Sequence, residues 1–167
     1  MLEALPSALF VVLLLFAACS DVATMKIPNW LSIVLAAAFP LSALATGMPL
    51  PAIGLHLAFG FAVLAVGFLM FQFGLMGGGD AKLIAAASVW TGLGAFLPFA
   101  AWTMIAGGVM AAVLLFARYR LKPDAARPAF VNRLLKPRGG VPYGVAIMAG
   151  GLAALNTLPF ATALTLP

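Results

Sequence analysis

The sequence predicts an all-α polytopic membrane protein, a bundle of about six transmembrane helices. Hydrophobic residues make up 65% of the 167 residues and charged residues only 8%, a proportion that no water-soluble domain of this length can bury. Apolar runs of membrane-spanning length recur along the chain and are separated by segments rich in proline and glycine. We therefore expect residues 1–167 to form a single membrane-embedded domain.

The expected spans are six apolar runs, because a helix needs roughly 20 mostly apolar residues to cross the hydrocarbon layer. They are residues 3–20, 30–46, 52–73, 82–97, 98–117 and 142–160. Turn residues separate them, including a Pro-Asn pair at 28–29, GMPLP at 47–51 and a glycine run at 77–79. The segment GLGAFLP at 92–98 separates the fourth and fifth spans without fixing their boundary.

The basic residues predict the orientation. With six spans, all nine lysines and arginines lie in the connections 21–29, 74–82 and 118–140, on one face of the membrane. Basic loops remain in the cytoplasm, so we expect 118–140 to be a cytoplasmic loop and both termini to be on the non-cytoplasmic side. This distribution also explains the net charge of +5. We therefore expect contacts with membrane lipids and no nucleic-acid partner.

The first span has a second interpretation. LLLFAAC at 13–19 resembles a lipoprotein signal, in which the cysteine is lipidated and the preceding segment removed. Glu3 replaces the usual basic residue, however, and Phe16 stands where a smaller aliphatic side chain is typical. We therefore expect a retained helix in which Cys19 is a buried small hydrophobic residue.

Asp21 and Asp80 each lie where an apolar span meets the predicted cytoplasmic face. A charge deep in a membrane helix costs about 2.5–3.5 kcal/mol, so such residues are rare and often functional. Asp80 has an alternative structural role, since it could cap the fourth helix. No capping role is evident for Asp21, near the C-terminal end of the first helix. The topology predicts that the two carboxyl groups lie at the same depth.

Two neighbouring carboxyl groups do not both ionise easily, so one keeps a proton and the pair can act as acid and base on a water molecule. We expect Asp80, at a helix N-terminus beside Lys82, to ionise first and Asp21 to hold the proton. Glycines at 77–79 allow a peptide backbone to approach closely. The same glycines would also suit a plain turn or hinge.

At these residues the chain resembles a known family. DVATMKIPNWL at 21–31 and GGGDAKL at 77–83 resemble the two aspartate motifs of type IV prepilin peptidases, the GxGD class of aspartic intramembrane proteases. Gly77, Gly79 and Asp80 fill the G-x-G-D positions, and Asp21 fills the first aspartate position. VPYGVAI at 141–147 resembles the Pro-x-Gly segment near the family's C-terminus.

The resemblance implies a function. The family removes the basic leader from prepilin-like proteins at the cytoplasmic boundary of the bacterial inner membrane, for pilus assembly or type II secretion. The chain is similar to the short forms associated with Flp (tight-adherence) pili. It lacks the paired-cysteine extension of longer members, so the resemblance gives no support for their N-methyltransferase activity. We expect Asp21 and Asp80 to be catalytic, with Gly77, Gly78 and Gly79 beside them.

Further residues carry weaker signals. Lys82, Pro142, Tyr143 and Gly144 are candidates for substrate positioning or for tuning an aspartate pKa. Lys82 could equally follow the positive-inside rule, and the other three could simply begin the sixth helix. His56 would lie near the opposite face from the aspartates, which argues against a serine protease. With one cysteine and one histidine we expect no metal site and no cofactor.

Two rival functions remain open at this point. A proton-coupled carrier would use the same two aspartates as a relay, and a non-catalytic assembly protein would not need their chemistry. The glycine run favours the peptidase, because a relay needs carboxyl groups but no open backbone. The sequence leaves the oligomeric state open.

Overall fold

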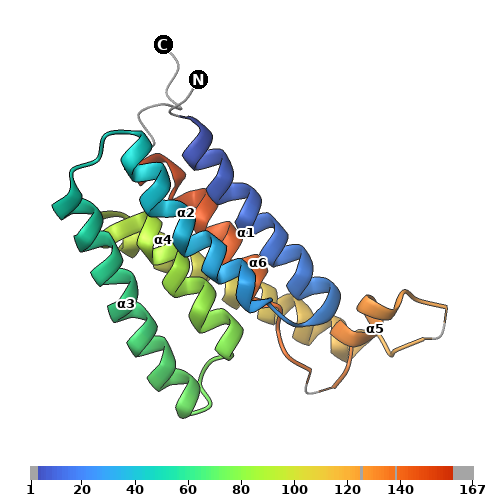
Figure 1. Cartoon of the computed structure of the whole chain (residues 1–167). Helices are drawn as coiled ribbons and strands as arrows, with labels where there is room; N and C mark the ends of the chain where they lie inside the picture. Colours follow the sequence, from blue (N-terminus) through green and yellow to red (C-terminus); the bar gives the residue numbers. More distant parts are fainter. Residues whose placement is uncertain (1–3, 125, 138, 160–167) are drawn as a thin grey trace.

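The computed structural model describes residues 4–124, 126–137 and 139–159, and these residues form helices without any β-strand (Figure 1). The elements, in chain order, are α1 (Ala4–Thr24), α2 (Asn29–Ala45), α3 (Leu50–Gln72), α4 (Gly78–Arg120), α5 (Ala129–Leu134), α6 (Tyr143–Ala153) and the 3-10 helix η1 (Leu155–Thr157). The predicted all-helical fold is confirmed in these ranges.

Three of the helices are long and apolar enough to cross a membrane. They are Leu5–Thr24, Leu50–Gln72 and the 43-residue Gly78–Arg120. Two shorter apolar helices, Asn29–Ala45 and Tyr143–Ala153, accompany them. These helices support a membrane protein. The number of crossings and the side on which the termini lie remain predictions.

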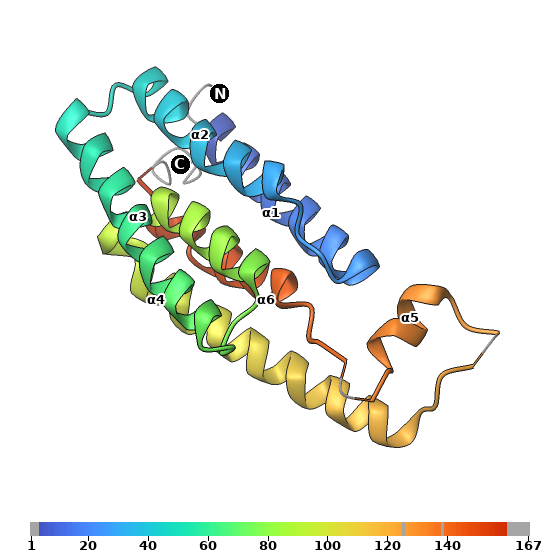
Figure 2. The ribbon, with the colours of Figure 1, turned by 60° about the horizontal axis from the view of Figure 1, so that its bottom comes forward.

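Helix α4 contains the boundary between the fourth and fifth expected spans, which the sequence left open. The chain bends at Gly92, whose φ of +56° and ψ of −170° lie outside helical values. The bend therefore lies at the first residue of the segment 92–98, within which the sequence left the boundary open. Pro98 is accommodated within the helix, whereas only glycine readily adopts the backbone angles found at residue 92. The bend splits α4 into two legs that run back past each other (Figure 2).

Other expected boundaries also shift. The first four spans begin or end within a few residues of α1, α2, α3 and α4, although residues 1–3 lie outside the described residues. The sixth span was too long, since α6 ends at Ala153 and η1 follows; residue 160 is not described. The loop at 118–140 contains the short helix α5. Cys19 is exposed rather than buried, because α1 directs the face that carries Leu14 and Ala18 inward.

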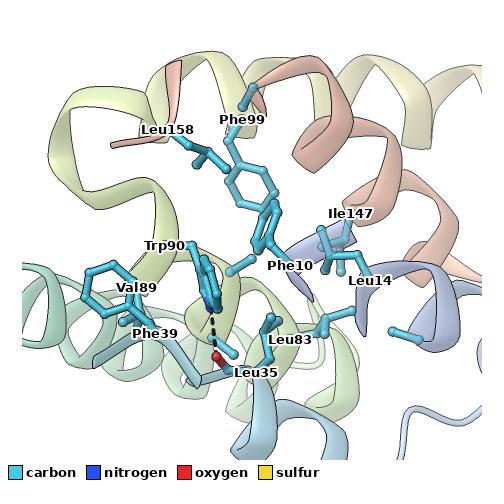
Figure 3. Close-up of a cluster of buried hydrophobic side chains, with 14 of the residues drawn as sticks. Phe10, Leu14, Leu35, Phe39, Leu83, Val89, Trp90, Phe99, Ile147 and Leu158 are labelled. Carbon is cyan, nitrogen blue, oxygen red and sulfur yellow. Dashed lines mark hydrogen bonds between the residues drawn. The ribbon is translucent and has the colours of Figure 1, made fainter. Parts of the chain in front are cut away.

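The core forms where α1, α2, α4 and α6 meet, and Trp90 lies at its centre (Figure 3). The Trp90 ring packs against Phe10 and Phe39 at centroid distances of 5.3 and 5.8 Å. Its Nε1–H group donates a hydrogen bond of 2.7 Å to the Leu35 carbonyl, which satisfies the only polar atom of a fully buried indole. This core holds the first leg of α4, and therefore Asp80, in a fixed position relative to α1.

The segments that carry the candidate site lie toward one end of the bundle. Figures 1 and 2 show the α1–α2 turn, the α3–α4 turn and α5 with its flanking segments at this end, and the α2–α3 turn at the other. Segments far apart in the sequence are thereby brought together, as the sequence predicted.

Candidate active site

The candidate site forms where α1 ends and where α4 and α6 begin. The turn after α1 contacts the start of α4, since a Cβ placed on Gly79 would lie 3.3 Å from Ile27 Cβ. The start of α6 contacts α1 directly, through Gly144 and Asp21. Two helix N-termini, which carry partial positive charge, therefore converge on the C-terminal turns of α1.

Asp21 is buried, with 6% of its surface exposed. Its Oδ2 accepts a hydrogen bond of 2.8 Å from the main-chain N–H of Gly144. Gly144 is the second residue of α6, and Pro142 at the N-cap position offers no side-chain cap. Asp21 thus caps α6 from another helix, because its carboxyl group satisfies an N–H that α6 cannot pair internally. Sequence reasoning did not predict this role, since the two residues are far apart in the chain.

Asp80 is less enclosed and is held differently. It is the third residue of α4 after the N-cap residue Gly77. Its carboxyl group folds back over that glycine, so that a Cβ on Gly77 would lie 2.6 Å from Asp80 Oδ2. The described residues form no hydrogen bond with this carboxyl group. The capping role considered for Asp80 is therefore not seen, and the aspartate that does cap a helix is Asp21.

The segments that carry the two carboxyl groups pack against each other, because Ile27 in the turn after α1 contacts Gly79, the residue before Asp80. The pairing of the two carboxyl groups themselves stays a prediction. Which of the two keeps a proton stays a prediction.

Each glycine of the 77–79 run has its own close contact. Gly77 lies under the Asp80 carboxyl group, a Cβ on Gly78 would lie 3.3 Å from the Phe71 ring, and Gly79 approaches Ile27. Cβ atoms this close to their neighbours are uncommon, so the run allows tight packing around Asp80. Gly77 itself is exposed and carries no side chain next to the Asp80 carboxyl group.

The remaining candidate residues from the sequence lie at different places around the site, and most of them do not contact an aspartate. Lys82 is exposed, and its Nζ donates a hydrogen bond of 3.0 Å to Asn29 Oδ1; it thus links α4 to α2 rather than contacting Asp80. Tyr143 packs on α4, where a Cβ on Gly107 would lie 2.7 Å from its ring. Pro142 is buried at the start of α6. Of these candidates, only Gly144 touches an aspartate.

Sequence reasoning missed several residues around the site. Met25, with a φ of +56°, ends α1 in a left-handed conformation that is unusual for a non-glycine residue. Its N–H donates a hydrogen bond of 2.7 Å to the Asp21 carbonyl. Arg118 and Arg133 bind main-chain carbonyls near α6 and α1. Any basic residue in these loops fits the orientation rule, so residue type alone does not point to these contacts.

Comparison with known proteins identifies the relationship. The family model for the type IV leader peptidase family matches residues 8–112. The chain belongs to this family. The matched segment contains Asp21, the glycine run and Asp80, and it ends before Pro142 and Gly144. No curated protein and no solved structure matches the chain. Membership in the type IV leader peptidase family makes the chain a peptidase, and its long apolar helices support a membrane protein.

Proposed function

We propose that this protein is an aspartic endopeptidase that removes the N-terminal leader from prepilin-like proteins. The reaction would take place at the cytoplasmic face of the bacterial inner membrane, in support of pilus or type II secretion assembly. The observation that carries the proposal is the packing of the turn after Asp21 against the glycine run before Asp80, where Ile27 contacts Gly79, on segments matched by the leader peptidase family.

The two carboxyl groups would act as an acid–base pair on one water molecule. One carboxylate removes a proton from the water molecule while the water oxygen attacks the scissile carbonyl carbon. The other carboxyl group donates its proton to the carbonyl oxygen. Return of a proton to the departing amine then breaks the C–N bond. The bond from Gly144 fixes the orientation of Asp21, while the exposed Gly77 leaves room for a substrate backbone beside Asp80.

Asparagine substitutions test this function. Asp21→Asn and Asp80→Asn should each abolish leader removal, because the amide keeps the side-chain volume but cannot exchange protons. In Asp21→Asn the amide oxygen can still accept the Gly144 N–H, so the helix contact should survive. The assay incubates purified protein in detergent with a candidate prepilin and measures product masses, which also report any added methyl group.

Asp124→Asn is the matched control. Asp124 is exposed in the loop before α5, and its Oδ1 accepts a local hydrogen bond from Ala126 N–H that asparagine can also accept. This variant should cleave like the native protein. Full processing by either the Asp21→Asn or the Asp80→Asn protein would refute the peptidase. Proton flux into vesicles that needs both aspartates, without any cleaved product, would favour the carrier instead.

A further inference from the structure

The polar segment between α4 and α6 is fastened to the rest of the protein by two arginines. Arg118, half-buried in the last turn of α4, donates from Nε to the Leu134 carbonyl at 2.8 Å and from Nη2 to the Gly140 carbonyl at 2.7 Å. Leu134 is the last residue of α5, where helical carbonyls have no internal partner. One guanidinium therefore joins the end of α4 to both the end of α5 and the segment that leads into α6.

The second arginine joins the same segment to α1. Arg133 Nη1 donates a hydrogen bond to the Ala23 carbonyl, which lies in the last turn of α1, two residues after Asp21. A cation at this position satisfies a terminal carbonyl and interacts favourably with the negative end of the helix dipole. It thereby offsets the presence of the Asp21 carboxyl group near that same end.

Together these hydrogen bonds form a closed series of contacts, here called the ring of contacts, that begins and ends at Asp21. From Asp21 the ring follows α1 to Ala23, crosses to Arg133, and continues through Leu134 and Arg118 to Gly140. Four residues later, Gly144 donates its N–H to Asp21. Met25, in the turn after α1, also packs close to this segment, since a Cβ on Gly140 would lie 3.1 Å from the Met25 Cε methyl group. The α6 N-terminus is thus connected to α1 both through the Gly144–Asp21 hydrogen bond and through the contacts of Arg118 and Arg133.

We propose that Arg118 and Arg133 are positioning residues that hold the Gly144 N–H on the Asp21 carboxyl group. The effect on catalysis rests on the proposed function, whereas the effect on the Asp21 carboxyl group does not. Membrane orientation requires only positive charge, which lysine supplies equally well. Arg118 instead uses two nitrogens of a rigid fork to bind two separate carbonyls, and one lysine ammonium does not reproduce that geometry.

Lysine substitutions separate the two roles. Arg118→Lys and Arg133→Lys keep the charge and the orientation, so any defect reports the lost hydrogen-bond geometry. Arg120→Lys is the matched control, because Arg120 is exposed on the same helix end and its guanidinium lies over the Phe116 and Tyr119 rings of its own helix. All variants are made in the full chain and compared below the melting transition of the least stable one.

The first measurement is the infrared band of the Asp21 carboxyl group in protein with ¹³C-labelled aspartate, assigned by its disappearance in Asp21→Asn. Arg118→Lys should shift or broaden this band, because one ammonium does not bind both carbonyls. Arg133→Lys should do so less, since lysine can still donate to the single Ala23 carbonyl, and Arg120→Lys should leave the band unchanged. The second measurement is cleavage of a prepilin, in which kcat should fall about tenfold with KM changed less than about twofold, as expected when a catalytic group is misplaced but substrate binding is retained.

The outcomes are distinguishable. An unchanged Asp21 band in both folded lysine variants would overturn the positioning role. A shifted band in a native protein that cleaves no prepilin would uphold the ring of contacts and count against the peptidase. An equal change in Arg120→Lys would show that the band responds to any arginine replacement at this end of α4, without the carbonyl contacts, and would also overturn the proposal.

Discussion

At the residue scale, Asp21 combines a structural hydrogen bond with its proposed catalytic role, whereas Asp80 has the proposed role alone. Asp21 accepts the N–H of Gly144 and so holds α6 to α1, whereas the described residues give Asp80 no hydrogen bond. A residue with both a structural bond and a proposed chemical role must be tested with substitutions that remove one role at a time.

Alanine substitutions should distinguish the two aspartates by stability. Asp21→Ala leaves the buried Gly144 N–H without its partner, which should cost about 1–3 kcal/mol of unfolding free energy. Asp80→Ala removes no such bond and should cost clearly less, while both variants lose activity. Thermal unfolding of the detergent-solubilised proteins measures the difference. Equal destabilisation by the two changes would contradict the capping role of Asp21.

Gly77→Ala should impair the reaction without unfolding the protein. The added methyl group would lie 2.6 Å from Asp80 Oδ2, so the carboxyl group must move, and displacement by about 1 Å can lower a rate on the order of 100-fold. Gly108→Ala is the control, because nothing lies within 4 Å of its added Cβ. Cleavage rates of the two variants make the comparison, and native activity in Gly77→Ala would show that the Asp80 position is not critical.

At the scale of elements, the bend in α4 determines where its two ends lie. Gly92 allows the positive φ, and the His56 ring occupies the space where a Cβ would be. His56 also stacks on Phe39 at 4.9 Å, and its Nδ1 lies 2.8 Å from the Val89 carbonyl. Because that partner is a carbonyl, His56 Nδ1 must carry the hydrogen. His56 thus packs on the bend, away from the aspartates.

Gly92→Ala should destabilise the protein by at least about 1–3 kcal/mol, the cost of holding a non-glycine residue in this backbone region. The clash with His56 adds to that cost, so the same change in a His56→Ala background should be less harmful but still unfavourable. Gly94→Ala, with nothing within 4 Å of its Cβ, is the control. A Gly92→Ala protein with native melting temperature would contradict the assigned bend.

At the scale of the whole molecule, the basic connections share one end of the bundle with the candidate site, and the turn at 46–49 lies at the other end (Figure 1). The positive-inside rule then predicts opposite membrane sides for Lys122 and Thr46. This orientation determines whether the aspartates can meet a leader that enters from the cytoplasm.

Cysteine labelling tests the orientation. In a Cys19→Ala background, which removes the native thiol, Thr46→Cys should react with a membrane-impermeant maleimide in intact spheroplasts. Lys122→Cys should react only after the membrane is opened. Both positions are exposed, so a difference in labelling reports the membrane side. The reverse labelling pattern would contradict the predicted orientation and place the aspartates on the non-cytoplasmic side of the membrane.

The sequence predicted the helices, and the gathering of the two aspartate-bearing segments at one end of the bundle, because hydropathy and charge are local signals with a simple relation to the bilayer. It placed the break within residues 92–98 but not at one residue, since Gly92 and Pro98 are both helix breakers; the structure shows the bend at Gly92. It also missed the Asp21–Gly144 bond and the two arginines. Those contacts join residues more than 100 positions apart or use main-chain atoms, which leave no trace in residue type.

Because Asp21 has a structural bond in addition to its proposed catalytic role, the two aspartates should be retained differently during evolution. In a lineage that no longer needed the proposed peptidase reaction, selection to keep Asp80 would be weak, since no hydrogen bond within the described residues involves its carboxyl group. Asp21, or an asparagine in its place, would persist longer because it still joins two helices. Inactive descendants should therefore be recognised by decay at the second motif before the first.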